Sequence, residues 1–194
     1  MPGHSPYEAV ENYRAPLIAA VKTLNPAAFL VPGRNSHNYQ LGAEGYWRLG
    51  DEYGLRLSPK DPECRSMRFI AEQRYRIVEC DPEKHEPELG SFRVTTLMYA
   101  YELAINDSTV WQMHWHPVGN SDEHRPHYHI SGDDHFSVKH HLPSGRHTIE
   151  DAVEWCIQHG ADPADPQWET VCAETKGVHV LHRSWSETPN EPHS

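Results

Sequence analysis

The chain has few cysteines and no long hydrophobic run. Its four cysteines are far apart and form no CxxC pair: Cys64, Cys80, Cys156 and Cys172. This spacing argues against a cysteine-based zinc site or a redox motif, and we expect reduced, structural thiols. No stretch approaches the roughly 20 apolar residues of a membrane span, and residues 1–13 lack the layout of a signal peptide. We therefore expect a cytoplasmic protein with no membrane partner.

Positive charge is also scarce. The chain has 17 Lys and Arg residues against 28 Asp and Glu residues, which gives a formal net charge of −11 with neutral histidine. Such a balance opposes nonspecific binding to a nucleic-acid backbone and argues against a nucleic-acid-coating role. Protonation of all 16 histidines would reverse the sign of the net charge. The field around the protein is thus expected to depend on pH near the histidine pKa of about 6.5.

A glycine-rich phosphate loop, a GxSxG motif and an HExxH motif are all missing from the sequence. The length and composition suffice for one domain with a hydrophobic core. Of the 194 residues 37% are hydrophobic, and six Trp and nine Tyr supply large side chains for that core. We expect residues 1–66 to form an N-terminal helix and an irregular arm. Residues 67–185 are expected to form a histidine-rich antiparallel core, and residues 186–194 a flexible tail.

Two helices have clear sequence signals. From Pro6 to about Leu24, apolar residues recur at steps of three and four, with Ser5 as the N-cap. Pro16 is expected to kink or split this helix. A second helix is expected to begin at Thr148, which forms a capping pattern with Asp151, and to end at Gly160. A further helix is expected to start within residues 165–172.

Strand patterns begin at Met67. Four segments alternate in hydrophobicity or are rich in aromatic and β-branched residues: 67–80, 92–105, 109–116 and 127–130. Residues 25–62 are rich in Gly, Pro and Asn and predict a long irregular arm, with a short strand or helix around Glu44 to Gly50. The sequence therefore predicts an α+β fold, in which an antiparallel sheet of four or more strands packs against a C-terminal helix.

Histidine is concentrated in one part of the chain. Nine of the 16 histidines lie between residues 114 and 147: His114, His116, His124, His127, His129, His135, His140, His141 and His147. Side chains on a strand alternate between faces, so His114 and His116 share one face and Trp111, Met113 and Trp115 the other. The apolar set is expected to face the core.

The same alternation applies to the next predicted strand. It places His127 and His129 on one face, with Tyr128 and Ile130 on the other. If the two histidine-bearing strands pair, four imidazoles converge on one sheet face. His114, His116, His127 and His129 are therefore the predicted site residues.

These four histidines are compatible with two chemistries. As neutral imidazoles they can bind zinc, iron, copper or nickel, as strand-borne HxH pairs do in cupin-like metalloproteins. As an acid and a base they can cleave a phosphodiester without metal. Our leading interpretation is a histidine-centred hydrolase or nuclease acting on RNA or a small anionic substrate. The alternatives are a metal-binding protein of cupin-like chemistry and a noncatalytic binding or interaction module. A purely structural role is also open, in which the histidines face solvent and bond only to backbone or carboxylate groups.

An anion site is predicted beside the histidines. Arg146 and His147 directly precede the helix that Thr148 caps, and the amides of a helix N-terminus attract phosphate or carboxylate. Arg125, two residues before His127, is a third candidate. Acidic residues in the first turn of this helix favour instead a plain turn and cap.

The motif order resembles a group of bacterial proteins of uncharacterised activity. The resemblance covers Arg74 to Trp185 and rests on "WQMHWHP", "RPHYHI", "HHLPSGR" and "TIEDAVEWCI", which match an HWHP, a PHxH and an HLPTGR-type turn before a helix. It implies no activity. More distantly, His116-Pro117 and Pro126-His127, with His129, resemble TumE-type toxins of toxin–antitoxin pairs, although residues 1–66 and the HLPSGR turn depart from that pattern. This likeness implies a toxin-like component with a cognate antitoxin as its partner.

Overall fold

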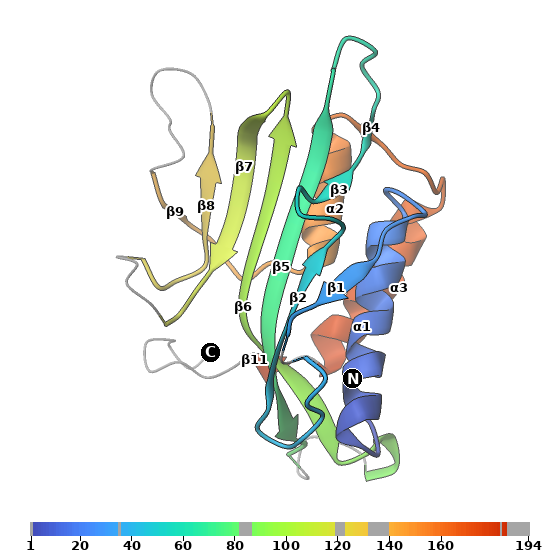
Figure 1. Cartoon of the computed structure of the whole chain (residues 1–194), viewed down its shortest axis with the longest axis vertical. Helices are drawn as coiled ribbons and strands as arrows, with labels where there is room; N and C mark the ends of the chain where they lie inside the picture. The colour runs from blue at the N-terminus through green and yellow to red at the C-terminus, as the bar shows by residue number, and fades with distance from the viewer. Residues whose placement is uncertain are drawn as a thin grey trace.

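An antiparallel sheet with helices packed on it forms the centre of the structure. The computed structural model describes residues 2–34, 36–81, 87–118, 123–131, 140–182 and 184–185. Three helices accompany its main sheet (Figure 1). The strands of this sheet follow the order β1 (Leu30–Pro32), β2 (Glu44–Leu49), β5 (Met67–Glu79), β6 (Phe92–Ile105), β7 (Ser108–Trp115), β8 (His127–Ile130) and β9 (Leu142–Pro143). The predicted α+β fold is confirmed. In the part of the chain that is described, no helix is long and apolar enough to cross a membrane.

Three long strands make the middle of the sheet. β5 (Met67–Glu79), β6 (Phe92–Ile105) and β7 (Ser108–Trp115) pair antiparallel in sequence order, as their patterns predict. Asn106 and Asp107 join β6 to β7 with positive φ angles of 51° and 63°. Two consecutive residues of this conformation form the tight turns whose twist suits a hairpin, and Asn and Asp tolerate it well.

The expectation of an irregular arm is wrong. Residues 25–62 contain four strands: β1 (Leu30–Pro32), β2 (Glu44–Leu49), β3 (Leu55–Arg56) and β4 (Ser58–Pro59). β2 and β3 both pair with β5, so strands from either side of residue 66 share one sheet. Of the short strand or helix expected around Glu44 to Gly50, the structure has the strand, β2. The other three are too short for alternation to be visible among the surrounding Gly and Pro residues.

Three helices cover one face of the sheet. α1 (Pro6–Lys22) starts where predicted, with Ser5 Oγ accepting a 3.2 Å bond from the Glu8 N–H. Pro16 does not split it, since α1 runs unbroken through this position. α2 (Ile149–Gln158) has the expected capping box of Thr148 and Asp151. α3 (Trp168–His182) extends well beyond the segment in which its start was expected.

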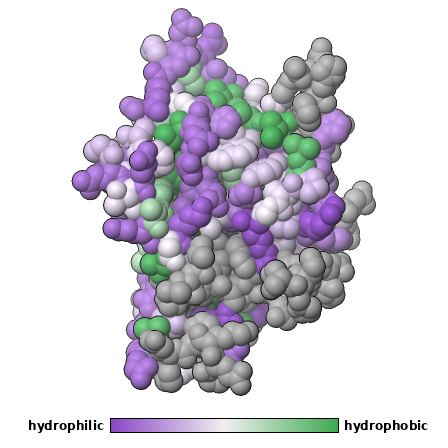
Figure 2. All heavy atoms as spheres, turned by 180° about the vertical axis from the view of Figure 1, so that it is seen from behind, coloured by the Kyte–Doolittle hydropathy of each residue, from purple (hydrophilic) through white to green (hydrophobic). Residues whose placement is uncertain are grey.

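The core lies between these helices and the sheet. Trp111, Met113 and Trp115 of β7 are fully buried there, which confirms the predicted inward face of that strand. Tyr99 and Tyr101 of β6 stack on each other beside them. On the other side of the sheet, Arg74 and Arg76 form exposed ion pairs with Glu44. Seen from behind the view of Figure 1, the described surface is mostly hydrophilic (Figure 2).

The last strands extend the sheet beyond β7. β8 (His127–Ile130) pairs antiparallel with β7, and β9 (Leu142–Pro143) pairs with β8, so that they form the edge labelled in Figure 1. β11 (Ser184–Trp185) pairs in parallel with β6. β10 (Ala161–Asp162) pairs with β4 in a separate two-stranded sheet. The predicted tail, residues 186–194, lies outside the described residues.

The two faces of β7 predict different mutational effects. Trp115→Ala removes a fully buried ring and should lower the free energy of unfolding by about 3–5 kcal/mol. His116→Ala, at a half-buried position on the opposite face, should cost much less. Urea unfolding of both variants measures the difference. Equal losses of stability would mean that the assigned faces of β7 are wrong.

Candidate metal centre

The four predicted histidines meet on the sheet face that points away from the helices. His114 of β7 lies directly opposite His127 of β8, and His116 and His129 each lie two residues along their strands. The ring centroid of His127 is 5.1 Å from that of His116 and 4.9 Å from that of His129. Tyr128, between the two β8 histidines, points the other way and stacks on Trp155 of α2 at 5.0 Å. The predicted convergence is therefore confirmed.

A fifth histidine completes what we call the histidine cluster: His114, His116, His127, His129 and His141. The ring of His141, next to β9, stacks on that of His127 with centroids 4.7 Å apart and lies 4.6 Å from that of His129. His141 is one of the nine histidines concentrated in this part of the sequence, but strand alternation did not predict it as a site residue. Its position depends on β9, whose two residues are too short a strand to show a pattern.

The cluster contains two overlapping sets of three ligand atoms. His114, His116 and His127 form the first set, and His127, His129 and His141 form the second. Within each set, one ring nitrogen from every residue lies within 4.8 Å of the others. Three imidazole nitrogens this close can serve as the donor set of a mononuclear transition-metal site.

The backbone fixes the tautomer of His127. Its Nδ1 lies 2.7 Å from the carbonyl oxygen of Arg125, and because a carbonyl only accepts, Nδ1 carries the proton. The lone pair is then on Nε2, which is buried and has no hydrogen-bond partner among the described residues. Metal-bound histidines show the same arrangement, with one nitrogen donating to a carbonyl and the other left for the metal.

Burial keeps His114 and His127 neutral. It lowers the pKa of His114 to about 3, and the neighbouring histidines lower it further in the same direction. Burial also lowers the pKa of His127, against the opposing effect of its hydrogen bond to Arg125. Neutral imidazole is the form that binds metal. His114 and His127 are therefore in the form that a metal binds, and neither is the protonated histidine that a metal-free mechanism would need near neutral pH.

The side chains predicted to bind an anion have other partners. The guanidinium of Arg125 forms two hydrogen bonds, of 3.0 and 2.8 Å, with the carboxylate of Glu123. Arg125 contacts the histidine cluster through its backbone carbonyl, which accepts the bond from His127. The guanidinium carbon of Arg146 lies 4.3 Å from the ring centroid of Trp115, on the helix side of the sheet. Anion binding by these arginines stays a prediction.

His147 also lies on the side of the sheet that the helices cover. Its backbone N–H donates a 2.9 Å bond to the hydroxyl of Tyr99, and its Nδ1 is 3.7 Å from a carboxylate oxygen of Asp151. Burial acts to raise the pKa of Asp151, but bonds from His147, Lys176 and the capping backbone outweigh it and lower that pKa. A carboxylate thus already occupies the start of α2, as in the plain cap that the acidic first turn suggested.

Other features of the molecule were not foreseen. Glu150 and His179 form a buried pair with a 2.7 Å contact, which joins α2 to α3.

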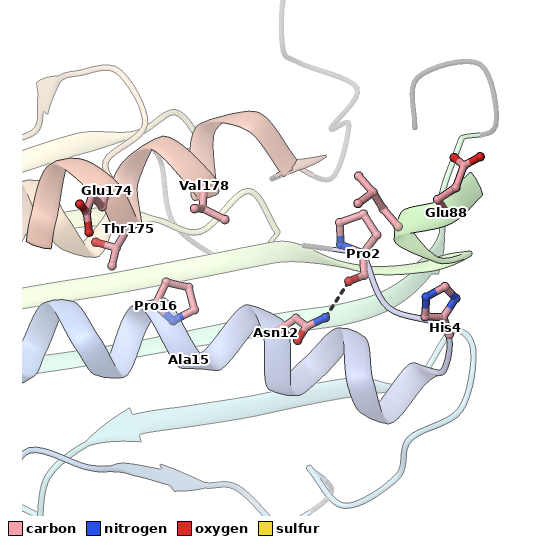
Figure 3. Close-up of a pocket in the computed structure, with 10 residues that line it drawn as sticks. Pro2, His4, Asn12, Ala15, Pro16, Glu88, Glu174, Thr175 and Val178 are labelled. Carbon is pink, nitrogen blue, oxygen red and sulfur yellow. Dashed lines mark hydrogen bonds between the residues drawn. The ribbon is translucent and has the colours of Figure 1, made fainter. Parts of the chain in front are cut away.

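A cavity of about 580 Å³ opens between α1, α3 and the 3-10 turn Pro87–Leu89, and its walls include Pro16 and Val178 (Figure 3). A second cavity, of about 280 Å³, lies between α2 and α3. Neither cavity is lined by the histidine cluster. Of the nine histidines singled out in the sequence, His135 lies outside the described residues.

Comparison with known proteins gives no family. No family model matches the chain, and no curated protein or solved structure matches it either. The resemblances read from the motifs consequently stay predictions. The chemistry of the histidine cluster is the basis for a functional argument.

Burial of neutral His114 predicts a pH-dependent stability of the metal-free protein. The folded pKa lies below the unfolded value of about 6.5, so the unfolded chain binds this proton more tightly. Stability should be full above pH 6.5 and fall progressively toward pH 3, with a loss of about 2 kcal/mol at pH 5 from His114 alone. Denaturant unfolding at pH 7 and pH 5, with chelator present, measures this loss.

The matched variants are His114→Gln, which should lose most of this pH dependence, and His37→Gln, at an exposed histidine outside the cluster, which should keep it. An unchanged pH dependence in His114→Gln would show that His114 is not the group responsible.

Proposed function

We propose that the protein binds a divalent transition-metal ion in the histidine cluster and that this centre is its functional site. The observation that carries the proposal is the buried Nε2 of His127, whose lone pair has no partner among the described residues. A buried polar atom without a bond costs roughly 1–3 kcal/mol, which coordination to a metal would recover. The rings of the other four cluster histidines lie around that of His127, at centroid distances from 4.7 to 5.7 Å.

The donor atoms restrict the choice of metal. Both sets of three ligands consist of imidazole nitrogens alone. Zinc, iron, nickel and copper accept such ligands, whereas magnesium and calcium require oxygen donors. The proposed occupant is therefore zinc, iron, nickel or copper, as in sites of cupin-like chemistry.

Hydrolysis is the second candidate function. Each set supplies three protein ligands, and catalytic zinc sites pair three protein ligands with a water in the fourth position. A bound metal would supply a water whose pKa is about 7, ready to attack a phosphodiester or another ester. RNA or a small anionic molecule is the proposed substrate. A toxin-like role with an antitoxin partner has only the motif resemblance as its support.

Metal content is the direct test of the proposal. Protein purified without a histidine tag or a nickel column should carry a stoichiometric transition metal, measured by plasma mass spectrometry. His127→Ala should lose it, because both ligand sets contain His127. His37→Ala removes an exposed histidine outside the cluster and should retain it. Wild-type protein that stays metal-free after incubation with zinc, iron, nickel and copper salts would contradict the proposal.

The hydrolase candidate predicts an activity that depends on the metal. Wild-type protein should cleave RNA or inhibit growth on expression, and a chelator should abolish the cleavage. The acid limb of its pH profile should follow protonation of the ligands. His127→Ala should be inactive but folded. If wild-type protein binds metal and is inert in both assays, the hydrolase candidate fails and a noncatalytic metal-binding module takes its place.

A further inference from the structure

Building on the proposed metal function, we infer that the histidine cluster holds one ion at two alternative positions that share His127, and that the ion enters through His141. We call His114, His116 and His127 the inner position, and His127, His129 and His141 the outer position. The two sets have only His127 in common. Whether they represent one ion or two depends on the atoms that His127 offers.

His127 has a single nitrogen available for a metal. Its Nδ1–H is bonded to the Arg125 carbonyl at 2.7 Å, so only Nε2 is left. An imidazole that bridges two metal ions must give up both ring protons and use both nitrogens. Occupation of both positions at once would therefore break the bond to Arg125. It would also bring two divalent ions close together, and their repulsion is strong where protein excludes water.

The two positions differ in access. His127 and His129 are buried, His114 and His116 are half-buried, and His141 is exposed. The only exposed ligand thus belongs to the outer position. Because His141 is the most exposed ligand of the cluster, we take it to be the first that an ion from solvent binds.

The positions also differ in how firmly the backbone holds their ligands. His114 and His116 come from β7 and its end, and β7 is paired along its length with β6 and for four residues with β8. His141 precedes β9, which is tied to β8 by two residue pairs. An exposed ligand on a weakly paired segment can release a metal and rebind it more readily than a ligand at a central strand.

Transfer between the two positions needs no release of the ion. In the proposed transfer, Nε2 of His127 stays bound while His114 and His116 replace His129 and His141 as ligands. The rings that must exchange are neighbours, because the centroid of His114 is 5.0 Å from that of His129. The geometry therefore describes an exchangeable metal centre, unlike a structural zinc site with four fixed ligands.

Single and double variants separate this arrangement from a fixed site. His141→Ala leaves the inner position complete and His116→Ala leaves the outer one, so each should still bind one zinc or cobalt ion. The double variant breaks both positions and should lose tight binding. Equilibrium dialysis with zinc and the visible spectrum of the cobalt(II) protein report stoichiometry and ligand set. Thermal unfolding checks that each variant is folded, and His116→Gln replaces His116→Ala if the latter is not.

Entry through His141 has its own readout. In stopped-flow mixing with cobalt(II), His141→Ala should take up the ion more slowly than wild type, whereas His116→Ala should take it up at the wild-type rate. His37→Ala is the control for the loss of an arbitrary exposed histidine and should match wild type throughout.

The possible failures are distinct. Wild-type protein without metal would reject the proposed function, and the inference with it. Two ions per chain would reject the inference alone, because the positions would then be independent. Loss of all binding in either single variant, or tight binding in the double variant, would also reject it, because the ion would then use one fixed ligand set. Equal uptake rates in all variants would reject His141 as the entry ligand.

Discussion

The register between β7 and β8 is the constraint on which the core and the candidate site both depend. It sets His114 opposite His127 and Met113 opposite Tyr128. Because side chains alternate along a strand, this single pairing directs the histidines to one face and the large apolar residues to the helices. A slip by one residue would bring every side chain of β8 to the wrong face, with His127 against the core and Tyr128 in water.

The segment that follows β8 couples the histidine cluster to the helical layer. His141 and β9 lie beside the cluster, whereas Arg146 covers Trp115 and His147 bonds to Tyr99 on the opposite side of the sheet. The capping box of α2 begins one residue later, at Thr148. The backbone thus crosses from the site to the core within a few residues and is held at both ends. The segment "HHLPSGRHT" therefore contacts the core on the helix side of the sheet and places His141 in the histidine cluster on the other side.

The sequence revealed the parts of the structure in which a pattern repeats. Alternating Trp, Met and His in β7 predicted both faces of that strand, and the capping residues predicted α1 and α2. The short strands β1, β3 and β4 were missed because two or three residues show no period, and β9 and His141 were missed for the same reason. The bond from His127 to the Arg125 carbonyl depends on backbone geometry that no residue pattern encodes. The pair of Glu150 and His179 joins residues far apart in the chain, and a single sequence carries no signal for it.

The central claim is that His127 binds a transition metal through Nε2 while Nδ1 donates to the backbone. Anomalous diffraction from a crystal of the zinc-loaded protein, recorded on both sides of the zinc absorption edge, tests this most directly. We expect one peak about 2.0–2.1 Å from Nε2 of His127, with at least two further cluster histidines as ligands. A peak at Nδ1, or no peak within the histidine cluster of the fully loaded protein, would contradict the account.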